Sequence, residues 1–144
     1  ETFWDRSTLY ALRGTIAAGE VGRGMAFLKK YSQRRLLGDH VPYAIEAWPE
    51  GNQRHLSAES GLYCRIYTEG LFGIRPTGLR SFEITPRLPQ EWEFANLNRV
   101  RAFGADFDIQ VKRAGGSKLA VTIVNGKKTI KKTISEGQTI TVRL

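Results

Sequence analysis

The chain of 144 residues contains a single cysteine, Cys64, and only two histidines, His40 and His55. One thiol cannot form an internal disulfide, and these three side chains are too few for a structural zinc site. We therefore predict no metal and no cofactor. Cys64 itself is expected to be a small buried apolar residue, and it leaves the cellular compartment open.

Long apolar segments are also missing. No stretch approaches the roughly 18 apolar residues of a membrane-spanning helix, and none resembles the apolar core of a signal peptide, so no membrane partner is predicted. The composition, with 41% hydrophobic and 25% charged residues, is that of a globular protein with one domain or two small ones. Because the first residue is glutamate, we expect a processed or excised piece of a longer chain.

The net charge of +8 arises almost entirely in the last part of the chain. From Lys112 to Leu144 there are eight lysines and arginines against one acid, Glu136. Within this part, the segment from Lys127 to Ile134 alternates lysine and threonine with isoleucine, which favours a half-buried strand whose charges protect an exposed sheet edge. Nucleic-acid binding is the alternative, but a basic patch without a binding motif or interleaved aromatics is weak support for it.

Up to residue 78 the apolar residues recur at helical spacing. A long loop is expected from Asp39 to about Leu56. The helix that follows it has apolar residues on more than one face, as in a helix buried within a larger helical assembly. The predicted helices are one capped at Asp5 or Ser7, one from Val21 to Leu36, and one from Ser57 to Phe72.

After residue 78 the apolar period falls to two, which indicates strands. Asn125 and Gly126, between two apolar runs, are a strong signal for a tight hairpin. About six strands can form an antiparallel meander or sandwich. The predicted fold class is therefore α+β, with helices in a domain at 1–78 and an antiparallel sheet domain at 79–144.

The segment AIEAWPEGNQRHLSAES, from Ala44 to Ser60, concentrates chemically capable residues in a predicted loop. Loops carry binding and catalytic residues more often than the scaffold does. Its members of interest are Glu46, Trp48, Glu50, His55 and Glu59. Glu46 is either a functional base or a solvated carboxylate, and Trp48 is either a sugar-stacking residue or a packing anchor.

Other carboxylates have simpler interpretations. Glu50 beside a proline and a glycine is expected in a turn. Glu59 is a charge at a helix start, or a buried partner of His55 or Arg65. Glu69, near a helix end, is expected to form a buried salt bridge with Arg65 or Arg75.

The segment TEGLFGIRPTGLRSFEITPRLP, Thr68 to Pro89, resembles the passage from the catalytic helical toroid into the C-terminal β-sandwich of bacterial six-hairpin (α/α) glycosidases, most closely the α-L-rhamnosidases. Upstream, Ile45-Glu46-Ala47-Trp48 is similar to that family's aromatic-Glu-x-Trp signature, with isoleucine in place of the aromatic residue. Arg54-His55 stands where the family has Asn-His. Leu56-Ser57-Ala58 is similar to the opening of the last helix of glucoamylases.

This resemblance implies that residues 1–78 are the last hairpins of an α/α toroid and that the enzyme cleaves glycosidic bonds with inversion. It implies Glu46 as the general base, with Trp48 and His55 binding the sugar. The general acid would lie before residue 1, so the piece would be inactive alone. The implied partners are a carbohydrate substrate and the missing N-terminal part of the parent chain, and enzymes of this type are usually exported.

A second class of function is also considered, a non-catalytic carbohydrate-binding or scaffolding module. The predicted helix from Ser57 to Phe72 favours the enzyme, because a free-standing module does not need a helix that is apolar on several faces. The sugar and the linkage are not specified by these residues.

Overall fold

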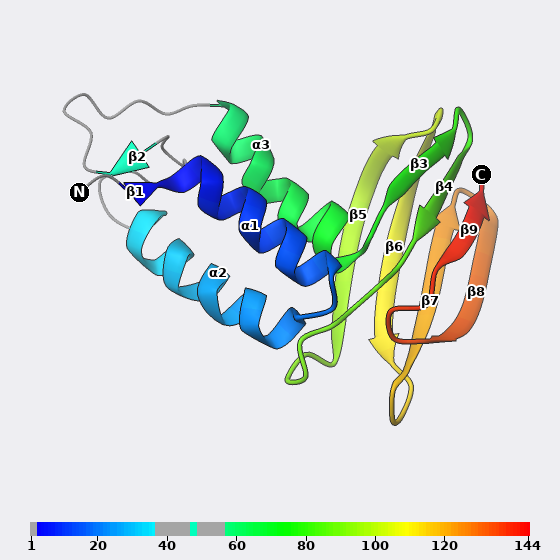
Figure 1. Ribbon diagram of the computed structural model, residues 1–144. Helices are drawn as coiled ribbons and strands as arrows, with labels where there is room; N and C mark the ends of the chain where they lie inside the picture. Colours follow the sequence, from blue (N-terminus) through cyan, green and yellow to red (C-terminus); the bar gives the residue numbers. More distant parts are fainter. Residues whose placement is uncertain (1–2, 37–46, 49–56) are drawn as a thin grey trace. The chain divides into compact units, whose positions relative to one another are not determined.

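The computed structural model describes residues 3–36, 47–48 and 57–144 (Figure 1) and divides into two compact units, Glu1–Leu71 and Phe72–Leu144. The first unit is helical and the second consists of antiparallel strands, so the α+β class is confirmed. The helical unit ends before residue 78. Strand β3 (Arg75–Gly78) pairs with β4 (Ser81–Ile84), and this pairing assigns it to the strand unit.

The helical unit is built around three helical segments. Helices α1 and α3 begin at the same end of this unit, and α2 runs in the opposite direction (Figure 1). The segments are α1 (Asp5–Ala17), α2 (Val21–Arg35) and α3 (Ser57–Arg65), which continues into a π-helix, η1 (Ile66–Leu71). Their buried apolar residues include Leu9, Leu12, Ile16, Leu28, Leu62 and Ile66. The helical spacing predicted for Leu9, Leu12 and Ile16 on one face of α1 is thereby confirmed.

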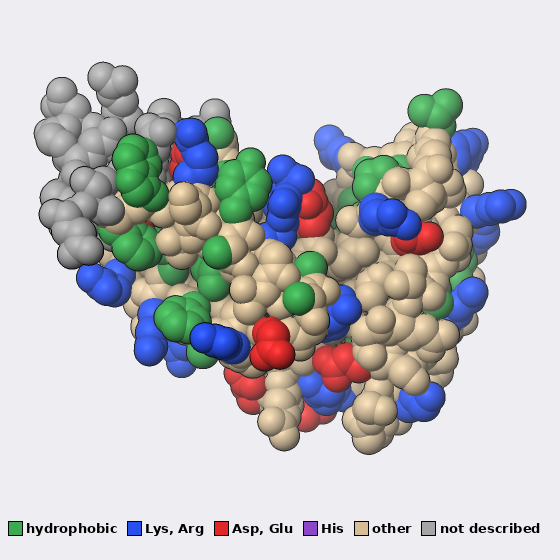
Figure 2. Space-filling model, in the orientation of Figure 1, with side chains coloured by type: hydrophobic (Ala, Val, Ile, Leu, Met, Phe, Trp, Pro, Cys, Tyr) green, Lys and Arg blue, Asp and Glu red, His purple; other side chains and the backbone are tan. Residues whose placement is uncertain are grey.

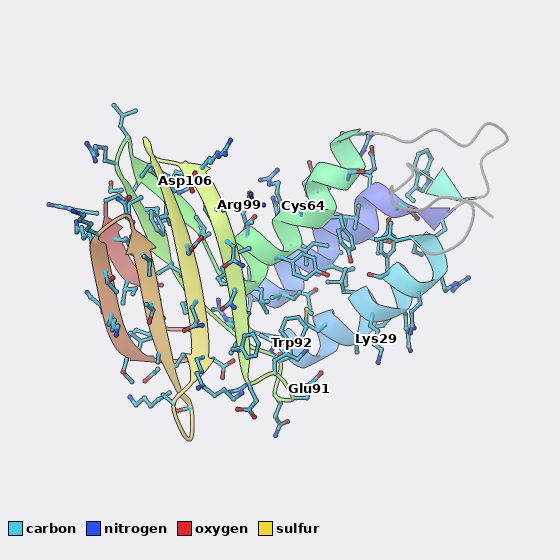
Figure 3. All side chains as sticks on the ribbon, turned by 180° about the vertical axis from the view of Figure 1, so that it is seen from behind. Lys29, Cys64, Glu91, Trp92, Arg99 and Asp106 are labelled. Carbon is cyan, nitrogen blue, oxygen red and sulfur yellow. The ribbon has the colours of Figure 1, made fainter. Side chains whose placement is uncertain are left out.

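The third helix differs from its prediction in two ways. Its last turn widens into η1, where Gly70 lies so close to α1 that an added Cβ would stand 3.5 Å from the carbonyl oxygen of Arg13. Its exposure is also one-sided, because Leu62 is buried while Cys64 and Arg65 are exposed. The expectation that Cys64 is buried was wrong; it projects from α3 toward solvent (Figure 3). Within α3 itself, the buried side chains Glu59 and Leu62 lie on one side of the helix.

A short antiparallel pair joins the start of the helical unit to the segment predicted to be a loop. Strand β1 (Phe3–Trp4) pairs with β2 (Ala47–Trp48), with Phe3 opposite Trp48 and Trp4 opposite Ala47. The pair joins the residues just before α1 to residues that follow Glu46 directly in the chain. Helix α1 then begins at Asp5, and the predicted side-chain cap is absent, because the capping position is Trp4.

The strand unit contains a three-stranded sheet, ordered β3-β4-β9, and a four-stranded sheet, ordered β5-β6-β7-β8. The remaining strands are β5 (Phe94–Ala102), β6 (Ala105–Arg113), β7 (Lys118–Asn125), β8 (Lys128–Ser135) and β9 (Ile140–Arg143). The predicted hairpin is confirmed, with Asn125 opposite Lys128 and Gly126 at φ +57°. The lysine-rich β8 is an edge strand of its sheet, as its pattern indicated.

Three phenylalanines connect the two sheets. Phe82 of β4 stacks on Phe103, with ring centroids 4.8 Å apart, and on Phe107 of β6 at 5.5 Å. Phe82 and Phe107 are fully buried or nearly so, with Ile109, Val111, Val121 and Val142 among the other buried residues of this unit. Burial of these apolar side chains is the main stabilising contribution to the unit.

The first residues of the strand unit are held by close backbone contacts. Gly73 has φ +63°, and a Cβ at this position would lie 2.5 Å from the carbonyl oxygen of Thr85. The amide of Thr85 donates to the carbonyl oxygens of Phe72 and Gly73 at 3.1 and 3.2 Å. Only glycine combines the left-handed conformation with the absence of a side chain that this approach requires.

Arg113 holds the proline-containing segment that follows β4. Its guanidinium donates to the carbonyl oxygens of Leu88, Pro89 and Trp92 at 3.1, 2.7 and 3.0 Å. Glu136 accepts from the amide of Leu88 at 2.8 Å and from Arg113 at 3.5 Å. A segment without regular hydrogen bonding is thus given partners for its backbone carbonyls.

Candidate functional site

The first turns of α1 and α3 and the β1–β2 pair together form what we call the helix-start region, residues 3–6, 47–48 and 57–60. Both helices present their N-termini here, and each carries an acid in its first turn, Asp5 in α1 and Glu59 in α3. Both carboxylates have no exposed surface. The partial positive charge of a helix N-terminus favours a carboxylate at such a position.

Asp5 links α1 to α2. Its Oδ2 accepts a hydrogen bond from the hydroxyl of Tyr31 at 3.2 Å, and both side chains are buried. Burying a carboxylate costs free energy unless hydrogen bonds compensate. The bond from Tyr31 and the helix N-terminus supply part of that compensation, and they fix the orientation of the first turn of α1.

Glu59 links α3 to α1. Its Oε1 accepts from Nε of Arg6 at 2.6 Å, and the side chain of Arg6 remains 45% exposed. The second carboxylate oxygen of Glu59 is buried and has no hydrogen-bond partner among the described residues, and the same holds for the hydroxyl of Ser60. The predicted charge at the helix start is observed, since Glu59 lies in the first turn of α3. It is also buried in an ion pair, but the cation is Arg6 and not the predicted Arg65, which pairs with Glu69.

A chain of hydroxyl groups continues from α2 to the end of α3. The hydroxyls of Ser32 and Tyr63 lie 2.8 Å apart, and those of Tyr63 and Tyr67 lie 3.0 Å apart. The ring of Tyr63 also packs against Tyr31, with centroids 6.3 Å apart. Burial, together with the hydrogen bond from Tyr63, raises the pKa of Tyr67 above its ordinary value of 10.0, so this hydroxyl stays protonated.

The other end of α3 carries an ion-pair cluster. Glu69 pairs with Arg65, one turn earlier in the helix, and accepts a second bond from Nη1 of Arg13 on α1 at 2.9 Å. The hydrogen bond to Glu69 raises the pKa of Arg65. The bridge between Glu69 and Arg65 is present as predicted, but it is partly exposed and not buried, and Arg75 pairs with Glu83 at 2.6 Å. This cluster ties η1 to α1.

Only some of the residues predicted to carry the chemistry lie among the residues that the structure describes. Glu46, Glu50 and His55 lie outside the described residues, and of Trp48 only the backbone is described, in β2. The structure does fix the residue directly after Glu46, since Ala47 pairs with Trp4.

Sequence reasoning missed Arg6 and the tyrosine cluster and treated Asp5 only as a cap. The spacing of Tyr63 and Tyr67, one helical turn apart, was the signal that could have revealed the hydroxyl chain. The partners Arg6 and Tyr31 come from other helices, which no local pattern connects to Glu59 or Asp5.

Within the described ranges, no three histidine, cysteine, aspartate or glutamate side chains are grouped as a metal site requires. Nor does any described helix have the length and apolar character needed to cross a membrane. No protein-family model matches the chain, and searches of curated proteins and of solved structures also found no match.

The helix-start region can therefore do two things chemically. It holds two helix N-termini, each with a buried carboxylate. The bond from Arg6 to Glu59 joins α1 to α3, and the bond from Tyr31 to Asp5 joins α2 to α1. The region also fixes the backbone directly after Glu46, at β2, and the backbone that begins two residues after His55, at the first turn of α3. Rigid support of this kind is what a catalytic or binding loop needs.

Proposed function

We propose that this chain is the C-terminal part of an inverting glycoside hydrolase, with Glu46 as the general base and Trp48 and His55 at the sugar subsite. The proposal combines the resemblance of the motifs around Glu46 and Thr68–Pro89 with the anchoring of the loop. In its finer form, the three helices are the last hairpins of an α/α toroid and the two sheets form its C-terminal sandwich. The ring contacts of Phe82 with Phe103 and Phe107 support the sandwich arrangement.

The observation that carries the proposal is the β1–β2 pair. A general base must be held within a fraction of an ångström of a productive position. Ala47, the neighbour of Glu46, is paired with Trp4, and Trp4 is followed by Asp5, whose carboxylate is bonded to Tyr31. The chain immediately after Glu46 is thus connected to the buried scaffold by backbone pairing.

The motif Thr68–Pro89 gains physical meaning from its contacts. Glu69 is held by Arg13 and Arg65, Gly70 lies against α1, and Gly73 approaches Thr85 more closely than any side chain permits. Glu69 and Gly73 therefore each have a local structural requirement in this fold, whereas a side chain at Gly70 would make only ordinary van der Waals contacts with α1. A motif with such requirements is a better basis for a resemblance than composition is.

The proposed reaction uses two carboxyl groups on opposite faces of the sugar. In inverting enzymes these groups are roughly 6.5–9.5 Å apart, which leaves room for the attacking water. Glu46 accepts a proton from that water while the water oxygen attacks the anomeric carbon. The general acid, expected in the part of the parent chain before residue 1, protonates the departing glycosidic oxygen. The indole of Trp48 offers a flat apolar surface for the sugar ring.

The test is hydrolysis by the full-length gene product that contains this sequence. Incubation with aryl glycosides, beginning with an α-L-rhamnoside, should release the free sugar with inverted anomeric configuration, as followed by proton NMR of the first product. Retention of configuration would contradict the proposed role of Glu46. The absence of hydrolysis, together with glycan binding by residues 1–144 alone, would favour the carbohydrate-binding module instead.

A further inference from the structure

A groove runs between α1 and α2 on the surface of the helical unit, with a volume of about 860 Å³. Each helix contributes one stripe of side chains at helical spacing. The stripe on α1 consists of Thr8, Ala11, Leu12, Thr15 and, just after the helix, Ala18; the stripe on α2 and its start consists of Glu20, Arg23, Gly24, Phe27, Lys30, Tyr31 and Arg34. The groove is lined mainly by apolar or small residues on the α1 side.

Among the described residues, the large exposed apolar side chains of the helical unit lie on α1, on α2 and in β1, and none lies on α3. Phe27 and Phe3, which both line the groove, are 54% and 47% exposed. Figure 2 shows hydrophobic side chains and the side chains of lysine and arginine side by side over α1 and α2. Apolar surface concentrated in this way marks an interaction site more often than a random surface does.

The charges along the groove are mostly positive. Arg23, Lys30 and Arg34 follow α2 at intervals of two and one helical turns, so they form a row along one rim. Lys30 also lies over the ring of Phe27, at 5.7 Å from its centroid. Among the described residues that line the groove, Glu20 is the only acid, and it stands at one end.

We infer that this groove binds an amphipathic helix whose apolar stripe is bordered by aspartate or glutamate residues. The apolar stripe would cover Phe27 and the small residues of α1, while the acidic border would face Arg23, Lys30 and Arg34. A helix of α1's length, about 13 residues, extends about 20 Å, so a partner of three to four turns fills the groove. Helix-in-groove binding of this kind uses anchors at i, i+3, i+4 and i+7.

Two other occupants fit less well. A symmetric dimer through the same face would place the cation row of one copy against that of the other, and like charges in contact oppose association. A membrane surface would suit exposed phenylalanine beside lysine and arginine, but the apolar residues here line a concave groove, which accommodates a rod and not a flat surface. The inference does not depend on the proposed catalytic activity.

The probes are two synthetic 14-residue helical peptides with the same leucine and alanine stripe, one bordered by glutamate and one by lysine. Binding to residues 1–144 is measured by fluorescence anisotropy and mapped by amide chemical shifts in NMR. We expect the glutamate peptide to bind at least tenfold more tightly than the lysine peptide, with shifts confined to α1 and α2. Phe27→Ala should weaken binding about tenfold, as expected for removal of a buried aromatic anchor.

Charge reversal provides the decisive comparison. The triple variant Arg23→Glu, Lys30→Glu and Arg34→Glu should exchange the preference, so that the lysine peptide binds more tightly. Lys29→Glu is the matched control, because Lys29 is an exposed lysine of α2 that does not line the groove (Figure 3). It should leave the preference unchanged, and circular dichroism confirms that each variant is folded.

Several outcomes would overturn the inference. Equal affinity for both peptides, or shifts mapping outside α1 and α2, would show that the rim charges do not select a partner there. Self-association of the free chain that Phe27→Ala abolishes would assign the groove to a second copy. Binding to vesicles of phosphatidylserine and phosphatidylcholine, without binding to either peptide, would assign it to a membrane.

Discussion

Glu59 at the start of α3 is fully buried and accepts a hydrogen bond at 2.6 Å from Nε of Arg6 in the first turn of α1. Replacing Arg6 with glutamine leaves a buried carboxylate without its cationic donor. We expect Arg6→Gln to lower the free energy of unfolding by about 2–3 kcal/mol and Glu59→Gln, which removes the buried charge itself, by about 1 kcal/mol.

Urea denaturation followed by the helical circular dichroism signal measures both values. Arg101→Gln is the control, since Arg101 is 81% exposed and its pair with Asp106 is a surface pair; it should change stability by less than about 0.5 kcal/mol. Equal and small effects of Arg6→Gln and Arg101→Gln would show that the buried pair does not support the helix-start region.

Tyr67 makes the stability of the helical unit depend on pH in the alkaline range. Its pKa in the folded chain is raised above the ordinary value of 10.0, first by burial and then by the hydrogen bond with Tyr63. Below pH 10 the hydroxyl is protonated in both the folded and the unfolded chain, so its contribution is fully present. As the pH rises above 10, the unfolded chain loses this proton more readily, and the free energy of unfolding falls by about 1.4 kcal/mol per pH unit for this group.

Denaturation curves at several pH values between about 9 and 11 measure this slope. Tyr67→Phe should reduce it, because phenylalanine has no proton to lose. In the same range, tyrosinate absorbance should show fewer ionised tyrosines in the folded protein than in the unfolded chain, because Tyr67 keeps its proton. If the free energy of unfolding of Tyr67→Phe fell with pH as steeply as that of the unchanged protein, Tyr67 would not be the group responsible.

Gly73 is the strictest backbone requirement in the strand unit. An alanine there would adopt φ +63° and place its Cβ 2.5 Å from the carbonyl oxygen of Thr85. Gly126→Ala is a matched control, because Gly126 has φ +57° but no atom within 4 Å of the added Cβ. We expect a loss of about 1 kcal/mol for Gly126→Ala, from the conformation alone, and about 3 kcal/mol or more for Gly73→Ala. Similar losses of stability for the two variants in thermal unfolding would mean that the backbone at Thr85 can shift at little cost in free energy.

Arg113 should not tolerate exchange for lysine. A single ammonium group cannot reproduce the planar fork that reaches the carbonyl oxygens of Leu88, Pro89 and Trp92. We expect Arg113→Lys to cost about 2 kcal/mol in the free energy of unfolding, with faster amide exchange in the segment around Leu88. Arg143→Lys, on an exposed residue of β9, should leave both measurements near those of the unchanged protein.

The regular elements followed from the sequence because their physical causes are local. Leu9, Leu12 and Ile16 mark α1 by spacing alone, and Asn125-Gly126 marks a hairpin because few other residues adopt that turn. The π-helical turn at η1 did not follow, since one widened turn barely changes the apolar period. The β1–β2 pair did not either, because two-residue strands have no detectable pattern.

The candidate site was predicted less well than the fold, for a related reason. Glu59 was recognised as a carboxylate that could be buried, but its partner Arg6 is distant in the sequence and on another helix. Tyr31 and Asp5 are likewise brought together only by the packing of α2 on α1. The roles of Glu46, Trp48 and His55 rest on a resemblance in a segment that lies largely outside the described residues, and they remain predictions.

The most direct test of the proposed function is the turnover number of Glu46→Gln in the full-length gene product. Glutamine keeps the size of the side chain but cannot accept a proton from water, so kcat should fall by about 10²- to 10⁴-fold while KM changes little. Glu50→Gln, four residues away in the same loop, is the control and should retain most of the activity. Azide, a small anion that can replace water as nucleophile, should restore part of the turnover in Glu46→Gln. A kcat near that of the unchanged enzyme in Glu46→Gln, with the loss appearing in Glu50→Gln instead, would contradict the assignment of Glu46 as the general base.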